Sequence, residues 1–265
     1  MNVITCRHYE ELSEKAAAII AETVKQKPDA VLGLATGGTP EGVYKELVRM
    51  HRSEGLSFRN VTTINLDEYA GLSPEDKNSY HYYMNTHFFA HIDSRKDRHF
   101  LPDGRADDLD AECGRYDRLI QTLGGADIQL LGIGHNGHIG FNEPGTPFES
   151  RTHVVELNEE TRQANARYFP SIDQVPEKAL TMGIGTILSG KRILIMASGK
   201  SKAQAVKQLL DGRVSEAFPA SALHAHPDVT VLIDEKVRGR RLKGFDLCRL
   251  INNLRFRFTF RLWNN

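Results

Sequence analysis

Short apolar runs alternate with helix-like segments along most of this 265-residue chain. Residues 30–35 (AVLGLA), 192–197 (RILIMA) and 229–234 (VTVLID) are apolar almost throughout, as in strands that are buried on both faces. Residues 9–27 instead place apolar side chains at helical spacing and stop before Pro28. Helices that connect parallel strands cover both faces of the sheet. The alternation therefore predicts an α/β fold: an open, mostly parallel, Rossmann-like sheet with helices on both faces.

The remaining predicted elements extend this series into a single domain. Further strands are predicted at residues 61–66 and 127–134, and further helices at residues 41–52, 107–123 and about 200–210. The series fills residues 1–237, which we predict to form one α/β domain. Residues 238–265 are rich in arginine and contain the alternating run RFRFTFRLW. We interpret them as an atypical basic C-terminal tail without a binding role.

Positive and negative side chains balance over the sequence. The 34 Lys and Arg residues equal the 34 Asp and Glu residues in number, so no overall field attracts nucleic acid or an anionic membrane. Cys6, Cys113 and Cys248 are odd in number and lack CxxC spacing, which argues against a disulfide framework and a structural zinc site. The N-terminus is not signal-like and no apolar run is long enough to span a membrane, so we expect a cytoplasmic protein with a small-molecule partner.

Two polar, glycine-containing loops follow predicted strands. Thr36-Gly37-Gly38-Thr39-Pro40 stands between a strand and a helix N-terminus, where backbone N–H groups, the helix dipole and hydroxyls favour an anion. Residues 198–202 (SGKSK) repeat this chemistry and add two lysines. The GxxxxGK[ST] spacing of a nucleotide-binding P-loop is absent, so the pattern indicates a phosphorylated substrate without implying a nucleotide. A tight turn with a capping threonine is the alternative.

Asp67 and Glu68 follow the predicted strand at residues 61–66. A carboxylate at the end of a buried strand can act as a general base if it stays ionised near a substrate C–H group. A helix cap or a surface pair of acids is the alternative interpretation, and the two residues alone favour that alternative.

Residues 127–147 (DIQLLGIGHNGHIGFNEPGTP) follow another predicted strand and contain a GxGxxG pattern. Together with Glu156 further on, this spacing resembles a dinucleotide-binding fingerprint. That fingerprint needs a helix to begin inside the motif, and Pro144 and Pro147 with the nearby glycines prevent one. We therefore reject the dinucleotide site and interpret the glycines as backbone freedom around polar side chains.

Those polar side chains are Asn136, His138 and Glu143. His138 and Glu143 are close enough in the loop for the carboxylate to orient the imidazole and raise its basicity, which makes a unit for proton transfer. A metal site formed by His135, His138 and Glu143 is a less favoured alternative, because no second cluster of ligands supports it. A histidine with a purely structural role is the other alternative.

Several motifs together resemble the glucosamine-6-phosphate deaminase family over residues 1–235. They are LATGGTPEGVY, INLDEY with GLSPEDKNSYHYYM, GIGHNGHIGFNEPG, SRTH, and TMGIGTIL with SGKSKA. INLDEY and GHIGFNEPG are highly specific, whereas TGGTP is shared with 6-phosphogluconolactonases. The resemblance implies that D-glucosamine 6-phosphate and water become D-fructose 6-phosphate and ammonia, in amino-sugar utilisation. It implies ring opening, aldose–ketose isomerisation and loss of the amine, and it requires no cofactor.

The resemblance also implies roles for individual residues. His138 would move the proton for ring opening, supported by Glu143 and Asn136, and Asp67 would take the C2 proton and return it to C1. The implied substrate-binding residues are Thr36, Gly37, Gly38, Thr39, Arg167 and Lys202, with the phosphate held chiefly by Thr39, Arg167 and Lys202.

The chain departs from the family pattern in three places. Asn136 stands where many members carry Asp, and residues 153–156 (HVVE) lack the basic residues with which the allosteric branch binds its activator between subunits. We therefore expect a monomer or small homo-oligomer instead of an allosteric hexamer. The tail after about residue 238 is the third departure. Two other functions stay open: a 6-phosphogluconolactonase-like hydrolase and a non-catalytic sugar-phosphate-binding regulator.

Overall fold

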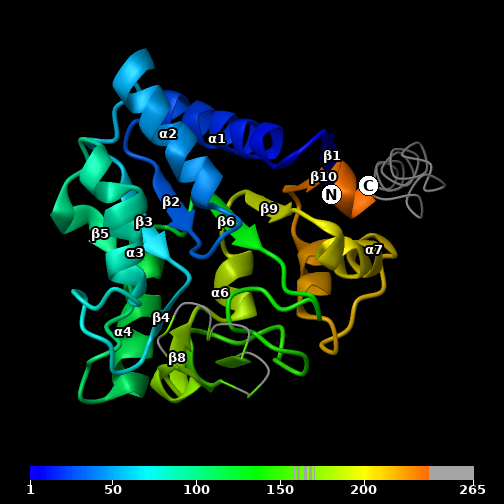
Figure 1. The fold of residues 1–265 in the computed structure, drawn as a ribbon. Coiled ribbons are helices and arrows are strands. Elements are labelled where there is room, and N and C mark those ends of the chain that lie inside the picture. Colours follow the sequence, from blue (N-terminus) through cyan, green and yellow to red (C-terminus); the bar gives the residue numbers. More distant parts are fainter. Residues whose placement is uncertain (158, 160–161, 164–165, 167–168, 170, 239–265) are drawn as a thin grey trace, which may run out of the picture.

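A sheet of parallel strands forms the centre of the molecule (Figure 1). The structure is a computed structural model that describes residues 1–157, 159, 162–163, 166, 169 and 171–238. Within these residues the sheet has seven strands, in the order β1 (Asn2–Cys6), β10 (Val229–Asp234), β9 (Ile193–Ala197), β6 (Ile128–Gly132), β2 (Val31–Leu34), β3 (Thr62–Asn65) and β5 (His99–Phe100). Every neighbouring pair is parallel, which confirms the predicted α/β sheet.

Helices cover both faces of this sheet. The first face carries α1 (Tyr9–Gln26), α2 (Glu41–Glu54) and α3 (Tyr80–His87); the second carries α4 (Leu109–Thr122), α6 (Ile184–Leu188) and α7 (Ala203–Leu210). The shorter turns are η1 (Phe89–His91), η2 (Lys96–Arg98), η4 (Ile172–Gln174), η5 (Lys200–Lys202), η6 (Pro219–Ala225) and α8 (Glu235–Arg238).

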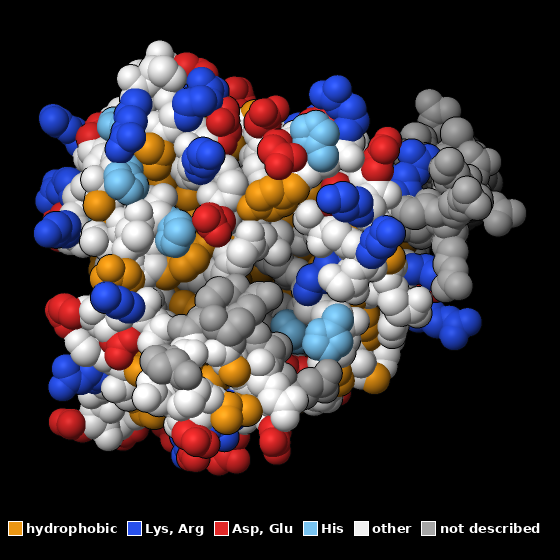
Figure 2. All heavy atoms as spheres, in the orientation of Figure 1, with side chains coloured by type: hydrophobic (Ala, Val, Ile, Leu, Met, Phe, Trp, Pro, Cys, Tyr) orange, Lys and Arg blue, Asp and Glu red, His pale blue; other side chains and the backbone are white. Residues whose placement is uncertain are grey.

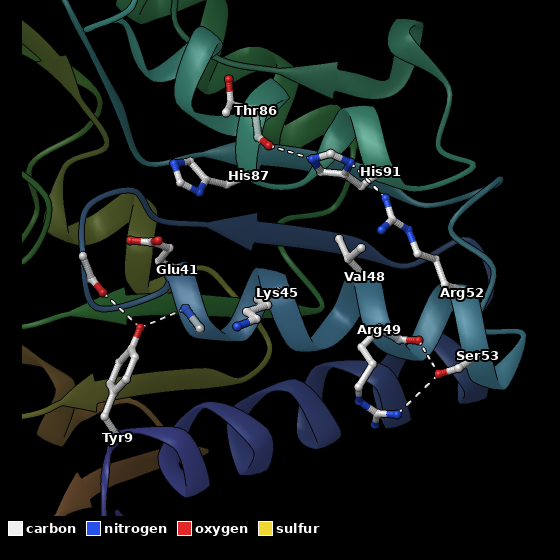
Figure 3. A pocket seen from close by; sticks show the side chains of 12 residues that line it. Tyr9, Glu41, Lys45, Val48, Arg49, Arg52, Ser53, Thr86, His87 and His91 are labelled. Atoms are coloured by element: carbon white, nitrogen blue, oxygen red, sulfur yellow. Dashed lines mark hydrogen bonds between the residues drawn. The ribbon is translucent and has the colours of Figure 1, made fainter.

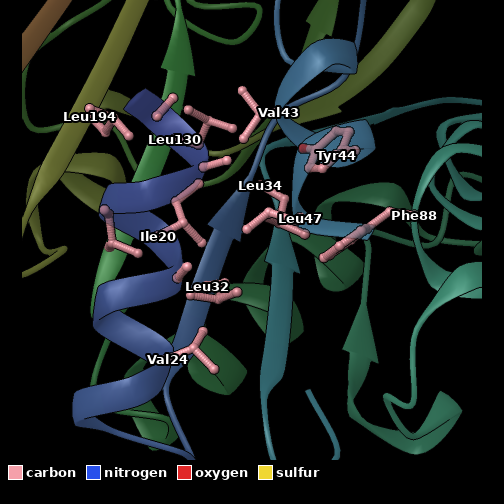
Figure 4. Close-up of a cluster of buried hydrophobic side chains, with 14 of the residues drawn as sticks. Ile20, Val24, Leu32, Leu34, Val43, Tyr44, Leu47, Phe88, Leu130 and Leu194 are labelled. Carbon is pink, nitrogen blue, oxygen red and sulfur yellow. The ribbon is translucent and has the colours of Figure 1, made fainter. Parts of the chain in front are cut away.

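The core follows from the two-residue period of the strands. Leu32 and Leu34 of β2 pack with Ile20 of α1 and Leu47 of α2 on the first face, as Figure 4 shows. Val31, which precedes Leu32 in β2, points to the opposite face and joins the core there. Successive side chains of a strand point to opposite faces, so a strand that is apolar at every position supplies both cores.

A second, antiparallel sheet lies beside the first and was not predicted. It consists of β4 (Asp67–Tyr69), β8 (Lys178–Thr181) and β7 (His153–Glu156). The predicted strand at residues 61–66 is β3, and the chain passes from it into β4 at Asp67. Each strand of the second sheet is short and pairs with residues far away in sequence, so local periodicity carries little sign of it.

Other boundaries also differ from the prediction. The helix expected at about residues 200–210 begins as the tight turn η5 and becomes α-helical only at α7. The edge strands β1 and β5 and the helix α3 were missed. No helix within the described residues is long and apolar enough to cross a membrane. The predicted tail lies outside the described residues, apart from Arg238 at its first position.

The order of the strands creates a crevice at one edge of the main sheet. β2 lies between β3 and β6, and the chain leaves β2 toward β3 but leaves β6 toward β9. The loops that follow β2 and β6 therefore diverge at their carboxyl ends, and such a switch point is where open α/β sheets bind ligands.

Candidate active site

A cavity of about 500 Å³ lies at this switch point. Its wall contains seven of the residues predicted from the sequence: Thr36, Gly37, Gly38, Thr39, Asp67, His138 and Lys202. These residues come from the ends of four strands, which the fold brings to one place. Asn136 and Glu143 do not line the cavity but contact the His138 segment. Arg167 lies outside the described residues.

The loop of residues 36–39 joins β2 to α2 and forms one side of the cavity. Gly37 has φ of +92°, a backbone conformation that residues with a side chain rarely adopt. On another side Lys202 belongs to η5, which follows β9. Buried Asp234 holds the start of that segment: it accepts hydrogen bonds from the Ser198 hydroxyl (2.7 Å) and the Gly199 N–H (3.1 Å). Both anion-binding loops predicted from the sequence thus reach the same cavity.

Asp67 is the carboxylate on the cavity wall, and it is only 7% exposed. Burial, followed by the negative charge of Glu68, raises the pKa of its carboxyl group to about 8. Within the described residues Asp67 caps no helix and is no surface acid, so the alternative interpretation does not apply to Asp67. For Glu68 the helix-cap alternative holds, because its carboxylate accepts from backbone N–H groups at the start of α3. A carboxyl group with this pKa is a stronger base than an exposed aspartate, but it must first lose its proton.

Glu68 is hydrogen-bonded to the backbone through its carboxylate. It is buried, and its carboxylate accepts hydrogen bonds from the backbone N–H groups of Tyr69 (2.8 Å), Tyr80 (2.9 Å) and His81 (3.0 Å). The His81 imidazole lies 2.8 Å from it through Nδ1. Glu68 thus fixes the N-terminus of α3 beside the cavity, and its charge stands next to Asp67.

His138 is held in the loop after β6 by two polar neighbours. Its Nδ1 lies 3.5 Å from Oε1 of Glu143. Asn136 donates from its side-chain amide to the other oxygen of Glu143 (2.7 Å) and accepts from the backbone N–H of His138 (3.2 Å). An aspartate at position 136 could not donate to Glu143, whereas the asparagine leaves Glu143 as the single carboxylate of this group.

Gly134 makes room for the His138 ring. A Cβ atom at this position would overlap the imidazole. The glycine of the GxGxxG pattern is therefore explained by close packing against a side chain, and no helix begins between Gly132 and Thr152 in the structure. The prediction that no helix begins in this motif is confirmed.

We expect Gly134→Ala to lower turnover strongly while the chain stays folded. The added methyl group must displace the imidazole, and a misplacement of about 1 Å at a reacting group costs on the order of a hundredfold in rate. The measurement is kcat beside the thermal midpoint. Gly114→Ala on α4 is the matched control, because Gly114 does not line the cavity and a Cβ atom there would meet only the flexible end of the Arg118 side chain at 3.3 Å. Equal turnover of the two variants would contradict the expectation.

Aromatic side chains complete the cavity, although no role was predicted for them from the sequence. Tyr69, Tyr80, Phe141 and Phe169 line it and pack on one another, with ring centroids 4.9 Å apart for Tyr69 and Tyr80. The tyrosine-rich run NSYHYYM was the available signal, since α3 places its first and fourth residues, Tyr80 and Tyr83, on one side.

The face of the molecule drawn in Figure 2 carries both signs of charge. Figure 2 shows acidic and basic side chains interspersed over this face, in agreement with the balanced composition. The described residues contain no group of three or more His, Cys, Asp or Glu side chains able to hold a metal ion. The proposed set of His135, His138 and Glu143 is therefore not assembled as a ligand set.

A second hollow of about 720 Å³ runs along α2 (Figure 3). It is lined by Lys45, Arg49 and Arg52 of α2 and by His91 across from them. It adjoins the first cavity, because the residues Gly38, Glu41, Thr86 and His87 line both. The 36–39 loop thus has the cavity on one side and this groove on the other.

Comparison with known proteins identifies the family. A family model described as glucosamine-6-phosphate isomerases and 6-phosphogluconolactonase matches residues 7–232. The chain belongs to this family. The resemblance found in the sequence motifs is thereby confirmed.

The most similar relatives found share nearly the whole chain. A glucosamine-6-phosphate deaminase of Bacillus velezensis is 98% identical over 239 residues, which are 90% of this chain and 99% of the relative. Glucosamine-6-phosphate deaminase 1 of Bacillus subtilis is 70% identical over 241 residues, 91% of this chain and 100% of the relative.

Solved structures support the fold. The structure of a monomeric glucosamine-6-phosphate deaminase, 71% identical, superposes with a TM-score of 0.88 and covers 89% of this chain and 98% of that one. A 6-phosphogluconolactonase from Trypanosoma brucei has a TM-score of 0.71 at 19% identity, covering 89% of this chain and 97% of that one. The lactonase shares the fold alone.

Proposed function

We infer that this chain converts D-glucosamine 6-phosphate and water to D-fructose 6-phosphate and ammonia in the cavity beside Asp67 and His138. Relatives at 98% and 70% identity carry the name of this activity, whereas the lactonase compared above is only 19% identical. The single observation that carries the assignment is the buried carboxyl group of Asp67, which faces the same cavity as His138 and the 36–39 loop.

The phosphate end of the substrate lies against the 36–39 loop and Lys202 in this proposal. Thr39 supplies a hydroxyl, the glycines allow close approach of the backbone, and Lys202 supplies a positive charge. Arg167, which the family resemblance places at the phosphate, completes the set. The helix dipole of α2 adds to the attraction, because the loop leads directly into the N-terminus of that helix.

The reacting end of the sugar lies between His138 and Asp67. His138 moves the proton that opens the ring, and Glu143 stabilises the imidazolium that forms for a moment. Asp67 then removes the C2 proton, which gives an enolamine, and returns the proton to C1, which gives an imine. Water hydrolyses this imine to the ketose and ammonia. The aromatic wall gives the carboxyl group an apolar surrounding, which favours its role as a base.

A joint assay of both products tests the proposal. The purified chain is incubated with glucosamine 6-phosphate, and ammonia and fructose 6-phosphate are measured together. We expect equal amounts of the two products. A folded sample without turnover would contradict the assignment. Tight binding of the substrate without product would favour the non-catalytic sugar-phosphate-binding regulator. Hydrolysis of 6-phosphogluconolactone instead would favour the lactonase.

The pH dependence follows from the raised pKa of Asp67. A base must be deprotonated to act, so kcat/KM should fall as the pH drops below about 8. The fall of kcat should occur at a lower pH than the fall of kcat/KM, because the ammonium group of the bound substrate favours the ionised form of the Asp67 carboxylate. Rates measured from about pH 6 to pH 9 check this. A flat kcat/KM across that range would remove Asp67 as the base.

We further propose that the chain acts as a monomer. The 71% identical relative of known structure is described as monomeric, and residues 153–156 lack basic side chains at the position used by the allosteric branch. Light scattering during size-exclusion chromatography should give the mass of one chain, about 29.7 kDa. The dependence of rate on substrate should be hyperbolic, and a hexamer with sigmoidal kinetics would refute the proposal.

A further inference from the structure

A tyrosine hydroxyl from α1 holds the backbone of the 36–39 loop. Tyr9, the first residue of α1, donates to the carbonyl oxygens of Gly38 (3.0 Å) and Thr39 (3.1 Å). The same hydroxyl accepts from the N–H of Gly42 in the first turn of α2 (2.8 Å). Figure 3 shows Tyr9 reaching across to this turn from the groove side of the loop.

A second hydroxyl holds the loop from α3. Tyr83 lines the cavity, and its hydroxyl donates to the carbonyl oxygen of Gly37 (2.7 Å). Its ring is supported by Tyr44 of α2, with ring centroids 6.4 Å apart. The carbonyl groups of three successive residues thus accept from tyrosines that come from two different helices.

The N–H groups of the same residues are not used in this way. Within the described part of the chain, the N–H groups of Gly37, Gly38 and Thr39 donate to no protein acceptor. The C=O and N–H of one trans peptide unit point in opposite directions. Fixing the carbonyl of Gly37 therefore turns the N–H of Gly38 away from Tyr83. Fixing the carbonyl of Gly38 likewise turns the N–H of Thr39 away from Tyr9.

We propose that Tyr9 and Tyr83 are positioning residues for the substrate's phosphate: they fix the loop carbonyls so that the N–H groups of Gly38 and Thr39 point at the phosphate oxygens. A pair of glycines would otherwise sample many conformations, and ordering it would weaken binding. Donors that are already oriented need no reorganisation when the anion arrives. The inference rests on the proposed function, since it assigns how that substrate's phosphate is held.

The variants Tyr9→Phe and Tyr83→Phe remove one hydroxyl each and keep the rings. We expect each to raise the inhibition constant of inorganic phosphate and the KM of glucosamine 6-phosphate by roughly three- to tenfold, the size of one lost hydrogen bond. kcat should change by less than about twofold, because the phosphate does not react and its binding is the same in ground and transition states. The double variant should lose more than either single variant.

Tyr116→Phe is the matched control. Its hydroxyl on α4 donates to the carbonyl oxygens of Asn65 (2.8 Å) and Phe100 (3.1 Å), so the variant loses bonds of the same kind away from the loop. We expect a lower thermal midpoint and an unchanged phosphate affinity. Single variants of Tyr9 and Tyr83 that lose thermal stability but keep the phosphate affinity of the unchanged chain would overturn the proposal.

The amide N–H groups of the loop can also be observed directly in the unchanged chain by nuclear magnetic resonance. When inorganic phosphate is titrated into the unchanged chain, the amide proton resonances of Gly38 and Thr39 should move downfield, as expected for new hydrogen bonds to an anion. Binding of phosphate without any shift of these two resonances would also overturn the proposal. This titration uses phosphate alone, so it separates a failure of this inference from a failure of the reaction assignment, which the product assay decides.

Discussion

Asp67→Asn should abolish formation of fructose 6-phosphate and ammonia. The substitution keeps the shape of the side chain but removes the group that takes the C2 proton, and loss of a general base costs roughly a hundred- to ten-thousandfold in rate. Binding should be nearly intact, because the proposed phosphate contacts are on the 36–39 loop and Lys202, which line the cavity. The measurements are turnover, binding of the substrate by calorimetry, and deuterium incorporation into product in heavy water.

The control for this variant is Asp97→Asn. Asp97 lies on the turn η2 and does not line the cavity, and its exposed carboxylate pairs with Arg95. This control variant should leave turnover unchanged. Near-normal turnover by Asp67→Asn would exclude Asp67 as the base.

The same variant should also stabilise the fold at alkaline pH. Because the pKa of Asp67 is raised from its ordinary value of 3.8 to about 8, the native chain keeps a proton that the unfolded chain has lost between those pH values. The free energy of unfolding therefore falls by about 1.4 kcal/mol per pH unit across this window from this group. Asparagine carries no such proton, so the difference in thermal midpoint between variant and parent should grow from pH 4 to pH 8.

His138→Gln is expected to have the second large effect. Glutamine can fill part of the space and donate a hydrogen bond, but it cannot accept and release a proton near neutral pH. Ring opening should then be limiting, with kcat lower by roughly a hundred- to ten-thousandfold. The loss should be smaller in the reverse direction from fructose 6-phosphate and ammonia, since a ketose can supply open-chain substrate. Initial rates in both directions are the measurement.

His153→Gln serves as the control for the histidine variant. His153 lies on β7, and its imidazole contacts the carbonyl oxygen of Arg151 away from the cavity. Turnover should be that of the parent chain. If His138→Gln slowed both directions equally, the imidazole would be needed for the isomerisation itself, and the assignment of His138 to ring opening would be wrong.

Most of the main sheet was predictable because its strands are buried on both faces. AVLGLA and VTVLID can satisfy their apolar side chains only between two layers of helices, and β2 and β10 lie there. The prolines after the GxGxxG pattern likewise excluded a helix without any tertiary information. The polar residues at the ends of these strands then had to meet at one edge, because parallel strands all end at the same side of their sheet.

The aromatic wall and the second sheet were not predictable by the same reasoning. β4 has three residues and pairs with β8 more than a hundred positions later, so its contacts leave no local pattern. Tyr80 was part of a recognised motif, yet its place beside Tyr69 depends on Glu68 receiving the N-terminus of α3. Long-range pairing of this kind is decided by burial and hydrogen bonding in the folded chain.

The sequence by itself determined the class of fold, and it predicted the two anion loops and the residues proposed to transfer protons, since each depends on local period or on the chemistry of a side chain. The tertiary structure decided how those residues are tuned. The pKa of the Asp67 carboxyl group is raised because the fold buries it beside Glu68. Asn136 became the donor that orients Glu143, and Tyr9 and Tyr83 came to share one loop. Electric field and hydrogen-bond direction depend on distances across the fold, which no local pattern in the sequence contains.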